Sequence, residues 1–376
     1  MAEKEAVNYN ETRMKIGIDG RYAEGKLTGI GQYIQKLVWG LSKKGHHIAL
    51  FYTKPPLSPL TEENIYSVVL PSKNRYCFEQ ILLPKALKKE GIELYHAAGN
   101  LGIPLFCPCP SVLTVHDIIP LLYPHYFSFS RFPFISQTSY FLRMAISLCR
   151  TNKIMADSQF TKDSLLKKFG VASEKITVVP LGIEAREGKG ELPEGVEKGK
   201  YIINNGGIDI RKNLFNLIEA FAALSPRFPK IKLVITGENP PLKQKLQTLA
   251  EKLGVADLVV FPGYVDEETL WALVRQAACL CLPTEIEGFG FPVLAGMAAG
   301  VPVVTSHISS LLEVADEAAI LVNPDKVEEI AIGLEKILTD RKLRESLVEK
   351  GLEQAKKFPW EKTISETINI YQEALK

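Results

Sequence analysis

The feature that most constrains the fold is a regular alternation of short apolar runs with longer amphipathic stretches along most of the 376-residue chain. The short runs are rich in β-branched residues, as expected of strands. The longer stretches carry apolar residues at helical spacing, as Ile34, Leu37 and Leu41 do within 31–44. This alternation predicts mostly parallel sheets with helices on both faces.

One stretch, 184–200, breaks the alternation. It is rich in Gly, Glu, Lys and Pro and poor in large apolar residues, which is typical of a linker. A chain of this length can form two domains with separate cores. We therefore predict an α/β protein of two doubly wound, Rossmann-like domains facing a cleft. The predicted limits are a flexible N-terminal tail at 1–13, a first domain at 14–183, a linker at 184–199, a second domain at 200–357 and a C-terminal helix at 358–376.

The expected elements follow the same pattern. Strands are expected at 15–19, 47–52, 93–96, 111–115, 153–156 and 176–179, and after the linker at 201–204, 232–236, 258–261, 278–282, 301–305 and 319–321. Helices are expected at 31–44, 78–89, 143–149 and 160–169, then at 214–223, 241–253, 267–276, 293–299, 327–338, 342–356 and 360–375. Ligands of such sheets bind beyond the carboxyl ends of the strands, so the cleft is the expected site.

Composition excludes several classes of function. The formal net charge of +2 argues against bulk electrostatic binding to nucleic acid. The polar segment Met1–Thr12 does not resemble a signal peptide, and no run approaches the roughly 20 apolar residues of a membrane span. The spacing of the six cysteines fits no zinc or disulfide framework, and Cys279 and Cys281 are expected in a core. We expect a cytoplasmic protein, either soluble or peripheral at the inner face of the membrane.

The most informative motif is Thr284–Pro302. Glu287 ends an apolar run directly before Gly288, Phe289 and Gly290, and a helix-like pattern follows. A carboxylate on such a strand-to-helix turn can accept hydrogen bonds from sugar hydroxyls. The glycines expose backbone N–H groups, and the helix N-terminus favours an anion. The turn therefore suits a ligand that carries both a sugar and a phosphate.

Two adjacent cations, Arg211 and Lys212, follow Gly207 at the start of a predicted helix. The helix dipole disfavours cations there, and a bound polyanion would remove that penalty. A guanidinium fork and an ammonium suit a diphosphate. The alternative is a solvated surface pair. The sequence contains no Asp-x-Asp, no His-Glu-x-x-His and no paired Cys/His set, so no metal site is predicted.

Three weaker motifs also lie at predicted strand ends. Gly29 and Gly31 open the first helix and can admit a ligand or simply form a tight turn. His116 and Asp117 follow an apolar run and would point into the cleft, or His116 is satisfied by backbone near the surface. Ser158 is best explained as a helix N-cap, with cleft contacts as a further option.

Taken together, these motifs resemble the retaining glycosyltransferases of family 4, whose two-domain fold is called GT-B. The resemblance extends over nearly the whole chain, from Lys15 to the last helix, and its most specific parts are 287–292 with 300–306, and 206–213. Segments 29–33, 78–80 and 116–120 support it. The resemblance implies that the first domain binds the acceptor and the second the nucleotide sugar, and that the final helix crosses back to the first domain near 358–360.

The resemblance also implies roles for individual residues. Arg211 and Lys212 would neutralise the donor diphosphate, Glu287 would bind the donor sugar, and His116 would lie near that sugar at the reaction centre. The implied catalytic residues are therefore His116, Arg211, Lys212 and Glu287. The implied donor-binding residues are Gly29, Gly31, Gly207, Arg211, Lys212, Glu287, Gly288, Phe289, Gly290 and the position of Ala295.

Two positions depart from the family pattern. Gly207 stands where an Arg often precedes the basic pair, and Ala295 stands where the second Glu of the family's Glu-x7-Glu motif is expected. In the family that Glu commonly holds the ribose of the nucleotide. We interpret Ala295 as the mark of a weakened or engineered variant.

The function implied is a retaining, metal-independent glycosyltransferase that needs no cofactor and takes a nucleotide sugar as substrate. By resemblance the transferred hexose is mannose, the donor GDP-mannose and the acceptor a saccharide or lipid-linked saccharide in surface polysaccharide assembly. The alternatives are a UDP- or dTDP-sugar donor, a non-catalytic nucleotide-sugar-binding protein, and a phosphorylase-like enzyme with Lys-bound pyridoxal phosphate. The aromatic segment 123–144, which includes Phe132 and Phe134, fits either a membrane-facing surface or part of the N-terminal core.

Overall fold

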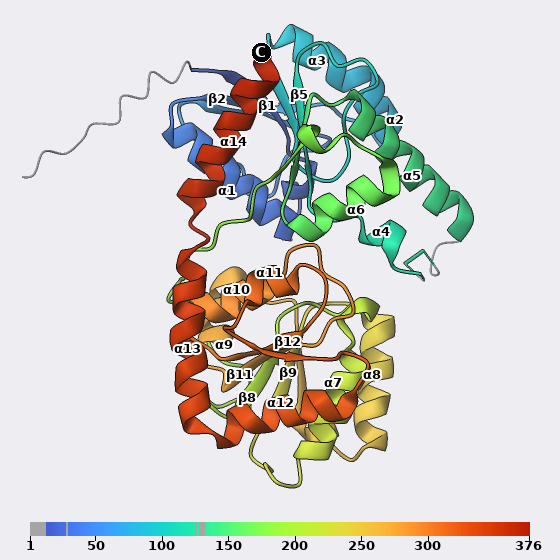
Figure 1. Cartoon of the computed structure of the whole chain (residues 1–376). Helices are drawn as coiled ribbons and strands as arrows, with labels where there is room; N and C mark the ends of the chain where they lie inside the picture. Colours follow the sequence, from blue (N-terminus) through green and yellow to red (C-terminus); the bar gives the residue numbers. More distant parts are fainter. Residues whose placement is uncertain (1–12, 28, 125, 128–131) are drawn as a thin grey trace, which may run out of the picture.

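Two parallel β-sheets, one after the other along the chain, organise the computed structural model, which describes residues 13–27, 29–124, 126–127 and 132–376. Figure 1 shows the two units one above the other, with the last two helices running along one side of both. Except for Arg13, the predicted N-terminal tail lies outside the described residues. The predicted α/β fold with two doubly wound units is confirmed.

The first sheet has seven strands in the order β3-β2-β1-β4-β5-β6-β7, and every neighbouring pair is parallel. Its strands are β1 (Lys15–Asp19), β2 (His47–Tyr52), β3 (Ile65–Val69), β4 (Leu94–Ala97), β5 (Ser111–Val115), β6 (Lys153–Ala156) and β7 (Ile176–Val178). The strand order reverses between β1 and β4. Ligands of such sheets bind at this switch point, beyond the carboxyl ends of the strands.

The second sheet has six parallel strands in the order β10-β9-β8-β11-β12-β13, with its switch point between β8 and β11. Its strands are β8 (Tyr201–Asn204), β9 (Lys232–Thr236), β10 (Val259–Gly263), β11 (Cys279–Leu282), β12 (Val303–Ser306) and β13 (Ile320–Val322). Cys279 and Cys281 are fully buried in β11, so the prediction that they are core residues is confirmed.

Helices cover both faces of each sheet, and each sheet accordingly has a cluster of buried apolar side chains on either side. In the first unit the α-helices are α1 (Gly29–Lys43), α2 (Arg75–Cys77), α3 (Leu83–Lys89), α4 (Ile119–Leu122), α5 (Pro133–Arg150) and α6 (Gln159–Phe169). In the second they are α7 (Leu214–Leu224), α8 (Pro240–Lys252), α9 (Glu267–Arg275), α10 (Phe291–Ala298), α11 (Leu311–Ala315), α12 (Val327–Thr339) and α13 (Arg341–Lys356), followed by α14 (Trp360–Leu375). One-turn 3-10 helices occur at Arg21–Ala23, Ser173–Lys175, Ile210–Lys212 and Ala256–Leu258, and Phe78–Leu82 is π-helical.

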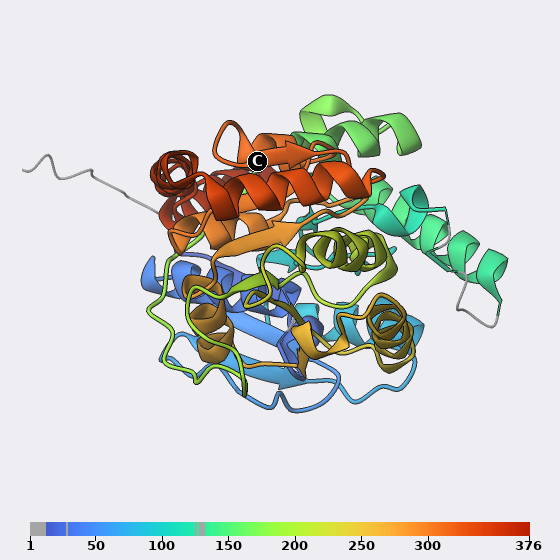
Figure 2. The same ribbon diagram turned by 90° about the horizontal axis from the view of Figure 1, so that it is seen from below.

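Besides the short helices α2, α4 and α11, which were not predicted, a strand and a long helix differ from the expectation. The edge strand β3 was not predicted, because its residues alternate between buried and exposed and carry little continuous apolar character. Helix α5 begins at Pro133, ten residues before the expected start at 143. Its early residues are mostly exposed and apolar, so no helical pattern of buried and polar positions marks them. Figure 2 shows α5 extending outward at the margin of the molecule.

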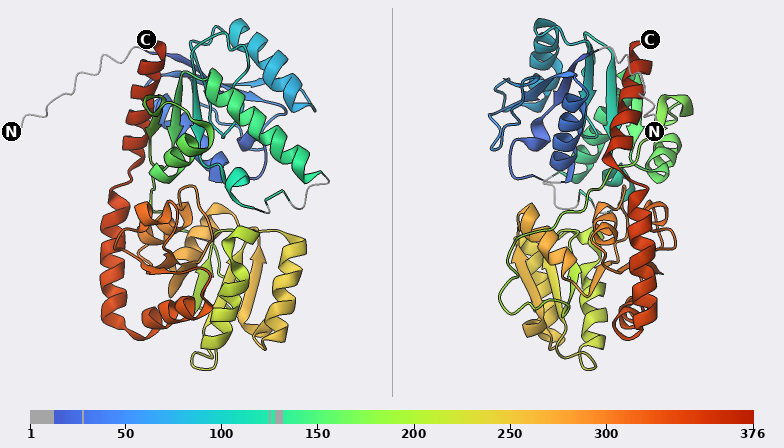
Figure 3. Two further views of the ribbon diagram at one scale, coloured as in Figure 1. Left: turned by 45° about the vertical axis from the view of Figure 1, so that its right-hand side comes forward. Right: turned by 90° about the vertical axis from the view of Figure 1, so that its left-hand side faces the viewer.

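The last helix, α14, packs on the first unit, although it follows the second in the chain. Figure 3 shows α13 and α14 nearly end to end along the side of both units. Ile364, Ile368 and Tyr371 lie in the same apolar cluster as α1, β1 and β2. At the crossing, the Ile183 N–H donates to the Phe358 carbonyl at 2.8 Å. The two segments that connect the units therefore lie side by side.

Segment 184–199, predicted as a linker, contains no helix or strand. It is nevertheless packed closely on the second unit. A Cβ atom added to Gly188 would lie 2.3 Å from the Ala272 nitrogen of α9, and the φ of Gly188 is +66°. The domain limits themselves remain a proposal.

A test of the α14 docking is Ile368→Ala. Ile368 is 1% exposed, and its truncation should lower the free energy of unfolding by about 2–5 kcal/mol because it leaves a cavity in the N-terminal core. The matched control is Leu375→Ala in the same helix, where the side chain is 41% exposed and the expected change is about 0.5 kcal/mol. Urea titration measures both. Equal, small effects would contradict the docking.

Candidate active site

The candidate site is built from the two loops that follow β8 and β11, the strands on either side of the second switch point. After β8, Asp209 accepts a hydrogen bond from the Arg211 N–H at 3.1 Å and caps the short 3-10 helix that carries Arg211 and Lys212. Helix α7 begins only at Leu214, after Asn213 with a φ of +55°. The prediction that the two cations open this helix was wrong, because the left-handed turn at Asn213 separates them from it.

The loop after β11 is tied directly to the first loop. The Glu285 N–H and the Thr284 hydroxyl both donate to the Arg211 carbonyl, at 2.8 and 2.7 Å. Beyond them, the Glu287 N–H donates to Ser309 Oγ at 3.1 Å, and Ser310 Oγ donates to the Glu287 carbonyl at 3.0 Å. The backbone on both sides of Glu287 is therefore fixed.

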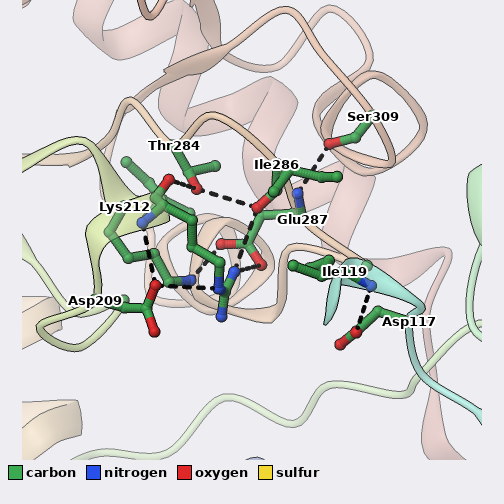
Figure 4. Close-up of polar contacts among 12 residues, drawn as sticks. Asp117, Ile119, Asp209, Lys212, Thr284, Ile286, Glu287 and Ser309 are labelled. Carbon is green, nitrogen blue, oxygen red and sulfur yellow. Dashed lines mark hydrogen bonds and ion pairs between the residues drawn. The ribbon is translucent and has the colours of Figure 1, made fainter. Parts of the chain in front are cut away.

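At the centre of the site, the Glu287 carboxylate pairs with both cations (Figure 4). Its Oε2 lies 3.2 Å from Arg211 Nη1, and its Oε1 accepts from Lys212 Nζ. Arg211 Nη1 also donates to the Ile286 carbonyl at 3.3 Å. Glu287 and Lys212 are almost fully buried, whereas the Arg211 side chain is 21% exposed. Arg211 is thus the member of this triad that a ligand reaches first.

The charges of the triad and its burial shift the pKa values of Glu287 and Lys212. Burial alone would raise the pKa of Glu287, but the charges of Lys212 and Arg211 outweigh burial and lower it. Burial also lowers the pKa of Lys212 against the opposing charge of Glu287. The triad itself carries one net positive charge, which Asp209 offsets, with its Oδ1 3.6 Å from Arg211 Nε. Its two cations suit an anionic ligand that displaces these carboxylates.

Other predicted donor-binding residues surround the triad. Gly288 and Phe289 follow Glu287, and Gly290, with a φ of +100°, directly precedes α10. Gly207, with a φ of +81°, lies in the loop after β8. Ala295 lies in α10, is 6% exposed and belongs to an apolar cluster of the second unit.

The glycines predicted in the first unit lie on the first turn of α1. This helix begins at Gly29, and Gly31 is buried against the Tyr22 carbonyl. From the loop just before α1, Lys26 Nζ lies 4.7 Å from the ring centre of Tyr264, which follows β10 of the second unit. The α1 end of the first unit thus faces the second unit near β10.

His116, the remaining predicted catalytic residue, has both ring nitrogens occupied. Nδ1 lies 2.6 Å from Asp157 Oδ2, and Nε2 lies 3.1 Å from the Ala98 carbonyl. Both partners are acceptors, so this geometry favours a ring that donates from both nitrogens. Burial would lower the pKa of His116, but Asp157 and the Ala98 carbonyl raise it overall. In this arrangement both ring nitrogens have partners within the first unit, so the placement of His116 near the donor sugar stays a prediction.

The two units contact each other beside the triad, at Gly288. A Cβ atom added there would lie 2.4 Å from the His116 carbonyl oxygen. Ser158 Oγ donates to the Gly288 carbonyl at 2.6 Å. Ser158 also accepts from the Thr161 N–H, so its predicted role as the N-cap of α6 is confirmed and the cleft contact is additional.

A further contact between the units was not predicted from the sequence. The Glu313 carboxylate, in α11, accepts from the backbone N–H groups of Gln159 and Phe160 at 2.8 Å each, at the N-terminus of α6. A carboxylate is favoured at this end of a helix. No local pattern around Glu313 indicates a partner some 150 residues away.

Comparisons with known proteins agree with this geometry. The family model "Glycosyltransferase Family 4" matches residues 27–187, and "Glycosyl transferases group 1" matches residues 192–354. O-antigen chain mannosyltransferase B of Escherichia coli is 28% identical over 274 residues, which cover 70% of each chain. O-antigen chain mannosyltransferase RfbU of Salmonella typhimurium is 30% identical over 250 residues, 66% of each chain.

Among solved structures, HepE of Anabaena in complex with UDP-glucose has the same fold, with a TM-score of 0.76 at 16% identity over 96% of this chain and 100% of that one. The two family models together span both units, and the site lies at the carboxyl ends of the strands, as the fold requires. This chain belongs to the family 4 glycosyltransferases and has the GT-B fold.

Proposed function

We propose that the protein is a retaining, metal-independent glycosyltransferase that transfers mannose from GDP-mannose to a saccharide or lipid-linked saccharide in surface polysaccharide assembly. The observation that carries this proposal is the buried triad of Arg211, Lys212 and Glu287 at the switch point of the second sheet. The two O-antigen mannosyltransferases support the choice of mannose.

In this proposal the donor diphosphate binds at Arg211 and Lys212, beside the N-terminus of α10 and the backbone amides of Gly288, Phe289 and Gly290. When the phosphates pair with the two cations, the Glu287 carboxylate is released and can accept hydrogen bonds from the hydroxyls of the hexose. Gly207 leaves room for the phosphates after β8, and Gly29 and Gly31 line the opposite wall. His116 acts as a positioning residue, through its carbonyl contact with Gly288.

The transfer itself exchanges one bond at the anomeric carbon. The acceptor oxygen attacks from the leaving-group face, and the bond to the phosphate oxygen breaks with its electron pair. The departing diphosphate takes the proton of the attacking hydroxyl. The protein therefore supplies position and charge stabilisation rather than a nucleophile. The contacts of Gly288 and Glu313 with the first unit support closure of the two domains around the donor.

Two alternatives have specific support. HepE, which shares the fold, holds UDP-glucose, so a UDP- or dTDP-sugar donor is the second candidate. Ala295, at the position of the missing Glu, favours weakened turnover or a protein that binds the nucleotide sugar without transferring it.

We also propose peripheral association with the inner face of the cytoplasmic membrane, through α5. Phe132 and Phe134 are 56% and 79% exposed, and Ile135 and Leu142 are exposed along the same helix. Tyr140, in contrast, packs against the N-terminal core. No helix among the described residues is long and apolar enough to cross a bilayer. An exposed apolar surface of this kind suits a membrane interface or a lipid-linked acceptor.

The proposed diphosphate site is tested by Arg211→Met. Losing a hydrogen bond from a charged group should weaken GDP-mannose binding roughly 10- to 100-fold. Calorimetry with GDP-, UDP- and dTDP-sugars measures the affinity of each donor. Because the buffer contains EDTA, the same experiment tests whether donor binding is independent of metal ions. Arg227→Met, which removes an exposed Arg paired with Glu335, is the control. Unchanged affinity in the Arg211 variant would refute the site; Lys212 is less suitable, because its removal leaves Glu287 buried without its partner.

The proposed defect at position 295 is tested by Ala295→Glu. A restored carboxylate facing the ribose should raise donor affinity about tenfold or more and increase the rate of transfer. Because Ala295 lies in an apolar cluster, the variant should also be less stable without donor and gain more melting temperature than wild type when donor is added. Ala295→Gln introduces a side chain of similar shape to Glu but without its charge, and it should raise donor affinity by a smaller factor. If affinity and rate do not rise with Glu, the interpretation of Ala295 is wrong.

The membrane proposal is tested by flotation with liposomes that contain phosphatidylglycerol. Wild type should float with the vesicles, and Phe132→Ser combined with Phe134→Ser should not. Both side chains are exposed, so the fold should be retained. The control is Leu312→Ser with Ile332→Ser, two residues of the second unit that are 48% and 52% exposed. Equal flotation of wild type and both variants would exclude a role for α5.

A further inference from the structure

Asp117, directly after His116, has a carboxylate oxygen that the fold does not use. Within the described residues this carboxylate accepts one hydrogen bond, from the Ile119 N–H to Oδ1 at 3.0 Å (Figure 4). The ring of His116, in contrast, is held by two acceptors. Of the two polar side chains that follow β5, Asp117 is therefore the one with a free lone pair for a ligand.

The turn that carries Asp117 is held rigidly by a residue in a rare conformation. Asn100 has a φ of +61°, uncommon for a residue other than glycine. Its Oδ1 accepts from the backbone N–H of His116 at 2.6 Å and from that of Asp117 at 3.4 Å. Its own N–H donates to the Thr114 carbonyl at 2.9 Å. Such conformations cost energy and persist where the surrounding contacts fix them, frequently at functional sites.

The same turn places Asp117 beside the donor site of the other unit. A Cβ atom added to Gly288, the neighbour of Glu287, would lie 2.6 Å from the Asp117 Cβ. Burial raises the pKa of Asp117, and the charge of Arg211 opposes that rise. The carboxylate thus lies in a partly dehydrated space, close to Glu287 and Arg211 but on the first unit.

Further polar atoms without partners lie on the same side of the cleft. The Tyr140 hydroxyl and Arg143 Nε are buried and have no hydrogen-bond partner in the described part of the chain. Burial and then the charge of Asp117 raise the pKa of Tyr140, so the phenol lies within the field of that carboxylate. Buried polar groups are normally paired, and each exception requires a reason. The Tyr140 hydroxyl is therefore a second candidate partner for a ligand that binds Asp117.

We propose that Asp117 binds the acceptor, by accepting a hydrogen bond from a sugar hydroxyl next to the one that attacks. This inference rests on the proposed function and adds a substrate class to it. Two carboxylates, Asp117 and Glu287, flank this position, so the reacting end of the acceptor is a neutral saccharide without a phosphate. Any lipid phosphate lies further along the acceptor. The proton of the attacking hydroxyl still passes to the departing diphosphate.

The test compares Asp117→Asn with wild type. The Asn Oδ1 can still accept from the Ile119 N–H, so the turn is retained while the charge is lost. We expect the KM for mannobiose and mannotriose to rise about 10- to 100-fold, as for a lost hydrogen bond to a charged group. The affinity for GDP-mannose measured by calorimetry should stay within about twofold of wild type. The slow rate of nucleotide release without acceptor should also change by no more than about twofold.

Asp163→Asn is the matched control, because Asp163 is exposed on α6 of the same unit and should leave every quantity unchanged. Tyr140→Phe should raise the acceptor KM by a smaller factor. An unchanged acceptor KM in Asp117→Asn would overturn the inference, and so would an equal loss of donor affinity, which would place Asp117 in the donor site. A wild-type protein that binds and cleaves no nucleotide sugar would instead overturn the proposed function itself.

Discussion

The arrangement of the site depends on one desolvated carboxylate. Glu287 is buried, and a buried charge is strongly destabilising unless it is paired and hydrogen-bonded. Its partners, Arg211 and Lys212, come from the loop after the neighbouring strand, so the ion pairs hold two loops of the second unit in one geometry. Without a ligand, the charged groups of the triad are paired with one another. In the proposed donor complex, binding of the diphosphate is an exchange of partners, in which the phosphates displace a carboxylate that then becomes available to sugar hydroxyls.

The same few residues link this exchange to the position of the two units. The Gly288 carbonyl, one residue after Glu287, accepts from Ser158 of the first unit, and Glu313 caps α6 of that unit. A shift of the Glu287 loop on ligand binding would therefore alter these contacts with the first unit. In the proposed function, donor binding and domain closure are therefore coupled through residues next to Glu287 in the chain. The two segments that connect the units lie side by side, where the Ile183 N–H donates to the Phe358 carbonyl.

The sequence predicted both sheets because buried parallel strands are continuous apolar runs and the intervening helices are amphipathic. It did not predict β3 or the first part of α5, where burial is partial or absent and the local pattern is weak. At the site, spacing and residue type indicated Glu287, Arg211 and Lys212, but not that they would pair with one another. No sequence pattern indicated the role of Glu313, because its partners are backbone groups that lie in the other unit.

Two buried histidines show why residue type alone does not settle a role. His96, at the end of β4, contacts the hydroxyls of Tyr371 and Thr114, and burial lowers its pKa to about 3, so it is neutral. His116, after the adjacent strand β5, contacts a carboxylate and a carbonyl, and these partners raise its pKa. Both ring nitrogens of each histidine therefore have hydrogen-bond partners within the fold. A side chain whose polar atoms all have partners in the fold can bind a ligand only by exchanging those partners, whereas an unmatched polar atom can bind one directly. By that criterion the acceptor side of the cleft is marked by a less conspicuous neighbour, Asp117.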